Sequence, residues 1–404
     1  MKKILCFLLI FLHCSIFAIQ PTICLNMIVK DESPVIKRCL ASVIPLVDYW
    51  VIVDTGSTDG TQEIIKEFMK DIPGELHEQG WVNFEHNRNQ ALQFAKGKGD
   101  YILLIDADEV LEFSKDFKLP QLEKDFYFID THFSGTIYKR VQLVNNHLDW
   151  KWTGVLHESI DSPQARSSDT LLGVVDVARP EGNRSQDPKK FSKDAQVLEK
   201  ALETDPHHTR YRFYLAQSYK DGGEYEKAIE NYQKRVAMQG FDQEVFWSLL
   251  QIGLMQEALK KPPAEVIESY KKAYAYRPSR AEPLYRLALY QRLQGNFEAA
   301  FEAASQGLSL KIPQDLLFVE NWIYEHGLLL EYSVAAYWTN RPLEALIASN
   351  LLLSKPSLPE NFKVCAENNL VWIYAKLAEA QAKAKAKDRY VTLDNPASQA
   401  ILAK

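Results

Sequence analysis

The chain has 404 residues, of which 46% are hydrophobic and 25% are charged. This composition is typical of globular proteins, and the length suffices for two or three domains. Its formal net charge is −6 and it lacks a sustained basic stripe, which excludes the usual nucleic-acid-binding classes. Three cysteines remain after the first 18 residues, too widely separated for a disulfide framework or a metal-ligand spacing.

Residues 1–18, MKKILCFLLIFLHCSIFA, have the pattern of a secretory signal: two lysines, an apolar stretch and a small residue, Ala18, where cleavage could fall. The apolar stretch is short for a membrane span, but an uncleaved N-terminal anchor is the alternative. We therefore expect a chain that is exported or membrane-associated. The sequence leaves open whether the leader is cleaved and which side of the membrane the rest occupies.

The N-terminal half alternates short apolar runs with helical patterns. The apolar runs predict buried strands at 22–29, 49–54 and 100–106. Helical patterns lie at 33–44 (with Ser33 as cap and Pro34 in the first turn), at 57–70 and at 83–97. This alternation predicts an α/β domain with a mainly parallel sheet, in which ligands bind beyond the carboxyl ends of the strands.

The sequence after about residue 190 is helical and carries an internal repeat. Segments 211–236 and 284–308 align at an offset of 72 residues, near a multiple of the roughly 34-residue tetratricopeptide period. The matched pairs are Phe213 and Tyr285, Leu215 and Leu287, Ala216 and Ala288, Gly223 and Gly295, Tyr225 and Phe297, and Ala228 and Ala300. This region resembles an all-α tetratricopeptide-like solenoid of about four helical pairs; a generic helical bundle is the alternative.

Acidic residues follow two of the predicted strands. Asp54 ends the run VIVD, before a turn of small residues and Asp59 near a helix start. Small residues let backbone N–H groups and a helix N-terminus face a ligand. A carboxylate at the Asp54 position suits hydrogen bonds to nucleobase N–H or ribose hydroxyl groups.

The next units add a cation and two more acids. Arg88 and Asn89 lie on a predicted helix, where the guanidinium can meet phosphate charge. Asp106 and Asp108, at positions i and i+2 of IDADE, can reach a hard divalent cation, which would stabilise a departing nucleoside diphosphate. Each feature alone is also explained by a solvated loop, a turn or a surface helix. Together, in this order, they fit successive portions of a nucleotide sugar.

At this point the sequence resembles a known family. The stretches NMIVKDES, VIVDTGSTDGT, HNRNQAL, LLIDADE and WKWTGVLHESI make residues 22–160 similar to a family 2 glycosyltransferase of the GT-A fold. The resemblance implies an inverting, metal-dependent enzyme that uses a nucleotide sugar. The added helices make the chain similar to bacterial repeat-containing glycosyltransferases. Many of those carry a histidine–glycine pair before the repeats, where this chain reads DVARPEGNRS.

The resemblance implies a donor-binding role for several residues. Asp54, with Asp59 in the same motif, would lie at the nucleobase. Arg88 and Asn89 would lie along the nucleotide, and Asp106 would lie on the ribose and metal side.

It also implies a metal centre and a catalytic group. Asp108 would bind Mn²⁺ or Mg²⁺ directly, and His157 would complete the site, unless it is a structural histidine. Glu158 would be the general base. Trp152 would be a platform for the sugar or acceptor, unless it packs in the core.

We therefore expect four parts: a leader at 1–18, a GT-A domain at 20–185, tetratricopeptide-like repeats at 190–380 and a flexible tail at 381–404. The expected reaction is transfer of a hexose, with inversion, from a nucleoside-diphosphate sugar to a hydroxyl acceptor, with a thiol acceptor as the alternative. The acceptor (a protein, peptide or glycan) or a protein partner would bind the repeats. A repeat scaffold with a vestigial transferase domain is the main alternative, and a sugar-phosphate nucleotidyltransferase is the weaker one because KDESP is not a Gly-rich basic loop.

Overall fold

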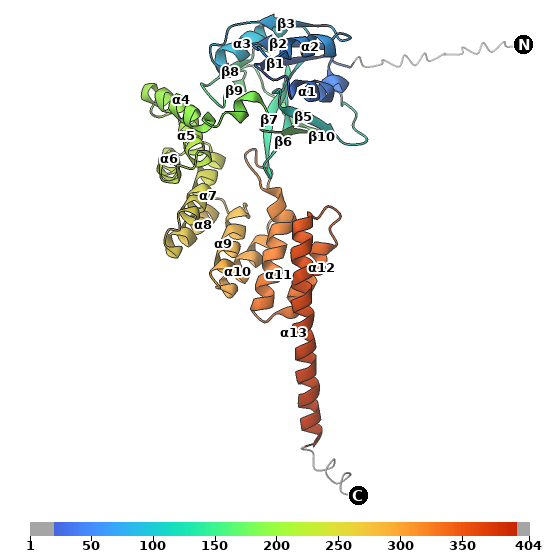
Figure 1. The fold of residues 1–404 in the computed structure, drawn as a ribbon, viewed down its shortest axis with the longest axis vertical. Helices are drawn as coiled ribbons and strands as arrows, with labels where there is room; N and C mark the ends of the chain where they lie inside the picture. The colour runs from blue at the N-terminus through green and yellow to red at the C-terminus, as the bar shows by residue number, and fades with distance from the viewer. Residues whose placement is uncertain (1–19, 394–404) are drawn as a thin grey trace, which may run out of the picture.

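The computed structural model describes residues 20–393, which form a sheet domain followed by a long array of helices (Figure 1). The predicted leader at 1–18 and the end of the predicted tail lie outside the described residues. No helix within 20–393 combines the length and the apolar character needed to span a bilayer.

The N-terminal domain is built on one eight-stranded sheet in the order β3-β2-β1-β4-β7-β6-β10-β5. The four strands at one side run parallel: β1 (Ile23–Val29), β2 (Tyr49–Asp54), β3 (Gly74–Glu78) and β4 (Tyr101–Leu104). The other strands are β5 (Glu109–Phe113), β6 (Phe126–Phe133), β7 (Thr136–Asn145) and β10 (Ser168–Ala178). Strand β7 pairs antiparallel with both β4 and β6, and β5 antiparallel with β10.

Helices cover both faces of the parallel strands. Along β1 the side chains alternate, so that Leu25 packs with α1 (Ile36–Val43) and α2 (Thr61–Phe68), while Cys24 packs with α3 (Phe84–Ala95). The α/β architecture predicted from the sequence is confirmed. One local prediction is wrong: α1 begins after Val35 rather than at Ser33, because residues 32–35 form a turn closed by the Glu32 carbonyl.

Two small strands and two short 3₁₀ segments complete this domain, and the first of these segments, η1 (Ile44–Leu46), directly follows α1. Strands β8 (Lys151–Thr153) and β9 (Ser159–Asp161) form a separate hairpin, and η2 (Asn183–Gln186) follows the last strand of the main sheet.

The helical array starts at α4 (Lys190–Thr204) and contains four pairs. They are α5 (Thr209–Asp221) with α6 (Tyr225–Met238), α7 (Asp242–Ala258) with α8 (Pro263–Tyr276), α9 (Glu282–Leu293) with α10 (Phe297–Leu308), and α11 (Leu328–Trp338) with α12 (Pro342–Leu353). A π-helical turn, η3 (Ile323–Gly327), precedes α11, and α13 (Glu360–Leu393) ends the described chain. The helix α13 continues past residue 381, where we expected the tail to begin.

The repeat predicted from the 72-residue offset is confirmed. Gly223 and Gly295 occupy the same turn in their pairs, with φ angles of +77° and +80° that L side chains rarely adopt. Ala228 and Ala300 are both buried at the next helix crossing. Small residues at these points allow the paired helices to approach closely.

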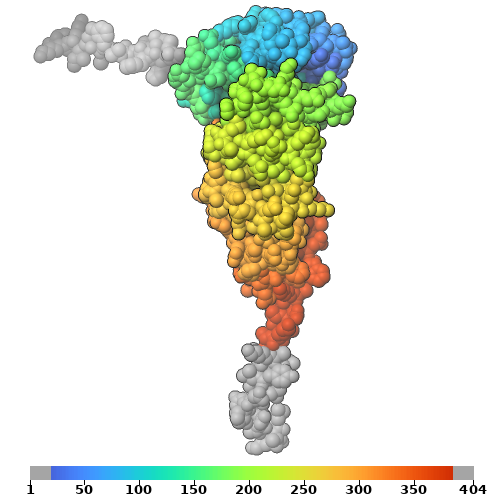
Figure 2. All heavy atoms as spheres, turned by 90° about the vertical axis from the view of Figure 1, so that its left-hand side faces the viewer, coloured from blue at the N-terminus to red at the C-terminus, as the bar shows by residue number. Residues whose placement is uncertain are grey.

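The array and the sheet domain contact each other at several separate points. The tip of the β6–β7 hairpin pairs with an extended segment of the array, because Ile137 and Val319 exchange backbone hydrogen bonds of 2.8 and 2.7 Å. Arg280 fixes that segment from inside the array through the Phe318 carbonyl (2.7 Å) and the Asp315 carboxylate (2.9 Å). Figure 2 shows the first helices of the array, in green and yellow-green, directly against the sheet domain.

Candidate functional site

Carboxylates gather at the carboxyl edge of the parallel strands. Strand β1 is followed by Asp31 and Glu32, β2 ends in Asp54, and β4 leads into Asp106 and Asp108. Because β1 lies between β2 and β4 in the sheet, the three strand ends are neighbours at one edge. Packing several acids together raises their energy unless cations or hydrogen-bond donors compensate.

Asp54 is buried at the end of β2 with one oxygen still free. Its Oδ1 accepts hydrogen bonds from the Gly56 amide (2.9 Å), the Ser57 amide (2.8 Å) and the Gln62 side chain (3.0 Å). Its Oδ2 is equally buried and has no hydrogen-bond partner, and the residue is only 1% exposed. Buried acceptors are rarely left unpaired, so this oxygen is available to an N–H or O–H group of a ligand.

Asp59 has a structural role in the turn after β2. Its Oδ1 accepts from the Thr61 hydroxyl (2.6 Å) at the start of α2, and its Oδ2 accepts from the Ser33 amide (2.9 Å). Despite some opposing desolvation, these hydrogen bonds lower the pKa of Asp59 to about 2. Asp59 therefore ties the loops after β1 and β2 together.

Arg88 joins two of the predicted site acids. Its guanidinium Nη2 lies 2.6 Å from Asp106 Oδ1, and its Nε donates to Glu158 Oε1. Burial alone would raise the pKa of Asp106, but the charges of Arg88 and Arg140 outweigh it and lower that pKa. The structure thus brings Asp106, Arg88 and Glu158 together in one chain of contacts.

A second half-buried cation, Arg140 of β7, compensates the acids behind Asp106. It pairs with Glu109 and lies 3.5 Å from Asp106 Oδ2 and 3.6 Å from Asp176 Oδ2. Burial raises the pKa values of Glu109 and Asp176, and Arg140 opposes that rise. Glu109 is thus a buried partner of Arg140, and also accepts from the Asp106 amide (2.9 Å).

Asp108 meets an acid that the sequence analysis missed. The Gly182 amide donates to Asp108 Oδ2 and the Asn183 amide to Glu32 Oε2, both at 3.3 Å. A Cβ built on Gly182 would lie 2.9 Å from the first oxygen and 3.1 Å from the second, so the two carboxylates converge there. Burial and the charges of Asp108 and Asp106 raise the pKa of Glu32 to about 7. Glu32 follows a strand end as Asp54 does, and this signal could have identified it.

Two residues that were predicted to bind the donor, Asn89 and Trp152, make contacts within the protein instead. The Asn89 side chain forms two hydrogen bonds of 2.8 Å with the backbone of Trp152, one as donor and one as acceptor. The Trp152 indole is only 6% exposed and packs in the core, with the Arg88 guanidinium carbon 5.0 Å from its ring centre. Trp152 as an open platform for a sugar is therefore a wrong prediction, since its ring supports Arg88 from within.

The His157 side chain packs against the helical array. Its ring stacks on Tyr214 of α5, with centroids 3.9 Å apart and an interplanar angle of 7°. Desolvation and the charges of Arg210, Arg184 and Lys190 lower its pKa to about 3. Across residues 20–393, no three His, Cys, Asp or Glu side chains converge as a metal site, so His157, Asp106 and Asp108 are not gathered into one.

Comparison with known proteins identifies the domain that carries these acids. Residues 24–153 match the family model for Glycosyl transferase family 2. This domain is a family 2 glycosyltransferase domain. The match covers β1 to β8 and so includes Asp54, Asp106 and Asp108.

Two curated proteins resemble a larger part of the chain. A TPR repeat-containing protein of Synechococcus elongatus is 28% identical over 293 residues, which cover 70% of this chain and 65% of that protein. The SPbeta prophage-derived glycosyltransferase SunS of Bacillus subtilis is 25% identical over 231 residues, covering 54% of this chain and 53% of SunS. The chain thus matches between half and two thirds of the length of these relatives.

Solved structures match this chain only loosely. They include MamA (19% identity, 40% of this chain and 81% of MamA, TM-score 0.33) and YrrB, a TPR protein with an unusual peptide-binding site (12%, 45% and 83%, TM-score 0.34). The repeat architecture is shown by the helix pairs α5–α6, α7–α8, α9–α10 and α11–α12.

Two of the acids at the strand ends fit a divalent cation. Asp108 and Glu32 converge on one point, and burial raises the pKa of both carboxyls. The charge of Asp106 adds to the rise at each of them, and the charge of Asp108 adds to it at Glu32. A hard cation suits this arrangement, since Mg²⁺ is typically held by one or two carboxylates and substrate phosphates.

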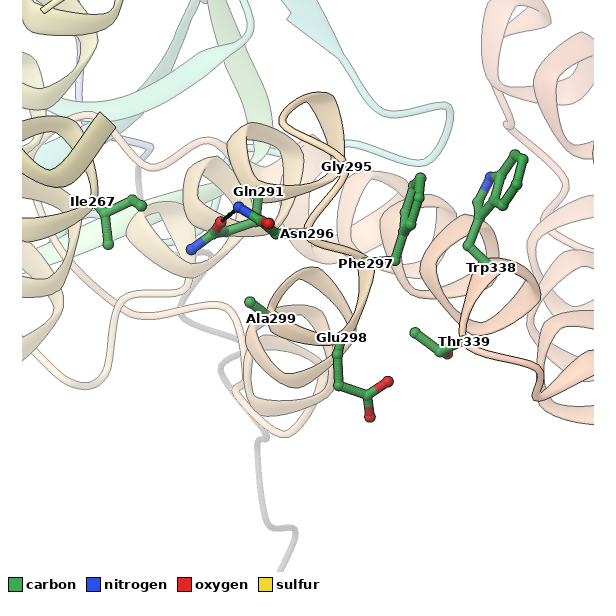
Figure 3. A pocket seen from close by; sticks show the side chains of 9 residues that line it. All are labelled: Ile267, Gln291, Gly295, Asn296, Phe297, Glu298, Ala299, Trp338 and Thr339. Atoms are coloured by element: carbon green, nitrogen blue, oxygen red, sulfur yellow. Dashed lines mark hydrogen bonds between the residues drawn. The ribbon is translucent and has the colours of Figure 1, made fainter. Parts of the chain in front are cut away.

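A separate hollow lies in the helical array. It has a volume of about 630 Å³ and lies between Ile267 of α8, the segment 291–299 and the end of α11 (Figure 3). Phe297 and Trp338 stack there with ring centres 4.9 Å apart, and Trp338 remains 57% exposed. This hollow contains none of the acids of the transferase domain.

The buried charge network gives a stability prediction. Arg140→Ala removes the cation that faces Glu109 and Asp176, so we expect a loss of about 3–5 kcal/mol in the unfolding free energy of the domain. Urea denaturation followed by tryptophan fluorescence measures it. The control is Asp149→Ala, which removes an exposed ion pair between Lys96 Nζ and Asp149 Oδ1, 3.0 Å apart. This change should lower the unfolding free energy by less than about 1 kcal/mol. Equal losses for the two variants would contradict the compensating role of Arg140.

Proposed function

We propose that this chain transfers a hexosyl group from a nucleoside-diphosphate sugar to a hydroxyl acceptor with inversion. The observation that carries the proposal is the row of acids at the ends of β2, β1 and β4, with one unpartnered buried oxygen on Asp54. The family 2 glycosyltransferase domain supports glycosyl transfer as the general chemistry.

The nucleoside would bind at the end of β2. Asp54 Oδ2 supplies a buried acceptor for a base or ribose donor, while its Oδ1 is held by the turn amides and Gln62. Because Oδ1 is already satisfied, the side chain is fixed before the ligand arrives, which lowers the entropy lost on binding.

The diphosphate would bind near the ends of β1 and β4. Asp108 and Glu32 would hold a divalent cation there, Mn²⁺ or Mg²⁺, with Asp106 directed to the ribose side. When bound, such a cation stabilises the negative charge of a departing nucleoside diphosphate. The amides of Gly182 and Asn183 already face these carboxylates, so the segment after β10 lies at the same place.

Glu158 is the proposed general base. Its side chain is 9% exposed, and Arg88 holds one of its oxygens, which leaves the other to accept the proton of the acceptor hydroxyl. A single displacement at the sugar carbon then inverts its configuration.

The metal assignment gives the first functional prediction. We expect Asp108→Ala and Glu32→Ala to abolish the strengthening of donor binding by Mn²⁺, because each removes one of two converging carboxylates. Asp54→Asn should instead weaken donor binding about tenfold or more with and without Mn²⁺, as expected for a lost hydrogen bond to a charged group.

Calorimetry with a panel of nucleoside-diphosphate sugars measures these effects. The control is Asp116→Ala, an exposed acid of the same domain. Unchanged Mn²⁺ dependence in Asp108→Ala would reject the cation site. A vestigial domain on a repeat scaffold would bind no donor in any variant.

The base assignment gives a kinetic prediction. Glu158→Gln should lower the transfer rate by roughly 10²–10⁴-fold because it removes the proton acceptor, while donor affinity stays near the wild-type value. Rates from labelled donor, set beside calorimetric affinities, measure the two effects separately. A wild-type rate in Glu158→Gln would exclude the base role alone.

The acceptor would be a protein, peptide or glycan that the helical array recruits. Supporting this proposal, the array contacts the transferase domain and has a hollow in which the exposed Trp338 stacks on the half-buried Phe297. Trp338→Ala should therefore lower transfer of labelled sugar to macromolecules in an extract while sparing donor hydrolysis. Loss of both activities together would contradict a role confined to recruitment.

A further inference from the structure

The loop that carries Glu158 has an unusual backbone. We define the Glu158 loop as residues 154–158, between β8 and β9. Gly154 has a φ of +123° and His157 a φ of +51°, so two of five residues occupy conformations with positive φ. A non-glycine residue in this region is strained, and such strain persists only where the surroundings hold it in place.

Within the transferase domain, polar contacts hold the two ends of this loop. At the start, the Gly154 amide donates to Glu85 Oε2 of α3 at 2.9 Å. At the end, the Glu158 carboxylate accepts from Arg88.

The middle of the loop is held by one face of α5, the first helix of the repeat pairs. The Tyr211 hydroxyl accepts from the Val155 amide at 3.3 Å, and Arg210 Nε donates to the His157 carbonyl at 2.8 Å. Tyr214 stacks on the His157 ring. Residues 210, 211 and 214 are spaced to lie on one side of a helix.

Packing reinforces these contacts. Leu156 is 5% exposed and belongs to the hydrophobic cluster formed by the array, with Leu198 and Phe213 among its members. The Arg210 guanidinium carbon also lies 5.0 Å from the centre of the Tyr214 ring, so the two α5 side chains that hold His157 contact each other.

We propose that Arg210, Tyr211 and Tyr214 are positioning residues that hold the Glu158 loop, so that helix α5 of the array completes the transferase site. This inference rests on the role proposed above for Glu158. The array then has a second task besides acceptor recruitment, because it sets the direction of a side chain in the reacting centre.

The physical consequence is a selective loss of rate. Release of the loop lets Glu158 leave the position set by Arg88, and a displacement of about 1 Å at a reacting centre can cost about 10²-fold in rate. Asp54 and Asp108 are held by the ends of β2 and β4 and by the segment after β10, outside the contacts of α5. Donor affinity should therefore be spared.

The test compares three full-length variants. Tyr214→Ala removes the stacking partner of His157, whereas Tyr214→Phe retains the ring. Tyr219→Ala makes the same change five residues later on α5, at a buried tyrosine that contacts Glu199 instead of the loop. The measurements are kcat and donor Kd with labelled nucleoside-diphosphate sugars, and hydrogen–deuterium exchange of the peptide that spans the loop.

We expect Tyr214→Ala to increase exchange in the loop and to lower kcat by about 10- to 100-fold with donor Kd unchanged. Tyr214→Phe should restore both, and Tyr219→Ala should change neither, even if it lowers the melting temperature. Wild-type loop exchange in Tyr214→Ala, or an equal loss of rate in Tyr219→Ala, would overturn the inference. A different outcome is that wild-type protein turns over no nucleotide sugar, while Tyr214→Ala increases exchange in the Glu158 loop and Tyr219→Ala does not. The proposed function would then be wrong, and the role of α5 in holding the loop would remain supported.

Discussion

The structure depends on the compensation of like charges at one edge of a sheet. Parallel strands bring their carboxyl ends together, and here those ends carry acids on β1, β2 and β4. The arginines that neutralise them come from different elements, Arg88 from α3 and Arg140 from β7. Without these two cations the buried carboxylates would repel one another and would lose hydration without any compensating charge. The antiparallel half of the sheet, which supplies Arg140, therefore stabilises the acids at the ends of the parallel strands.

The charge and hydrogen-bond compensation of these acids is incomplete at two places near the ends of β1, β2 and β4. Asp54 keeps a buried oxygen without a partner, and Asp108 and Glu32 converge without a side-chain cation between them. Most other acids at this edge pair with an arginine, an amide or a hydroxyl, although Asp176 Oδ1, behind Asp106, is also buried without a partner. Such local exceptions within a satisfied network mark where a ligand supplies the missing groups.

The array and the transferase domain act as one structural unit. A β-bridge joins Ile137 to Val319, and Leu156 of the domain lies in the hydrophobic cluster of the array. Arg184, just before α4, places its guanidinium carbon 5.1 Å from the ring of Phe84 on α3. The boundary predicted near residue 190 therefore marks a change in the sequence pattern, from alternating strands and helices to helices alone. The two parts on either side of it remain in direct contact.

The sequence by itself determined the parts of the protein that depend on local patterns. Strand β2 runs over the predicted residues 49–54, and Gly223 and Gly295 occupy the matched turns of the repeat, because hydrophobic periodicity and turn chemistry act over a few residues. Strand β3 and the antiparallel strands went unpredicted, because β3 (GELHE) has no apolar run and β6, β7 and β10 are only partly buried. Tertiary structure alone decided which site residues meet. Asp54, Asp106 and Asp108 could be found from the sequence because each follows a predicted strand. The burial of Trp152, the stacking of His157 on α5 and the convergence of Glu32 with Asp108 could not be found in this way. They depend on contacts between segments up to 151 residues apart, and no local pattern encodes such contacts.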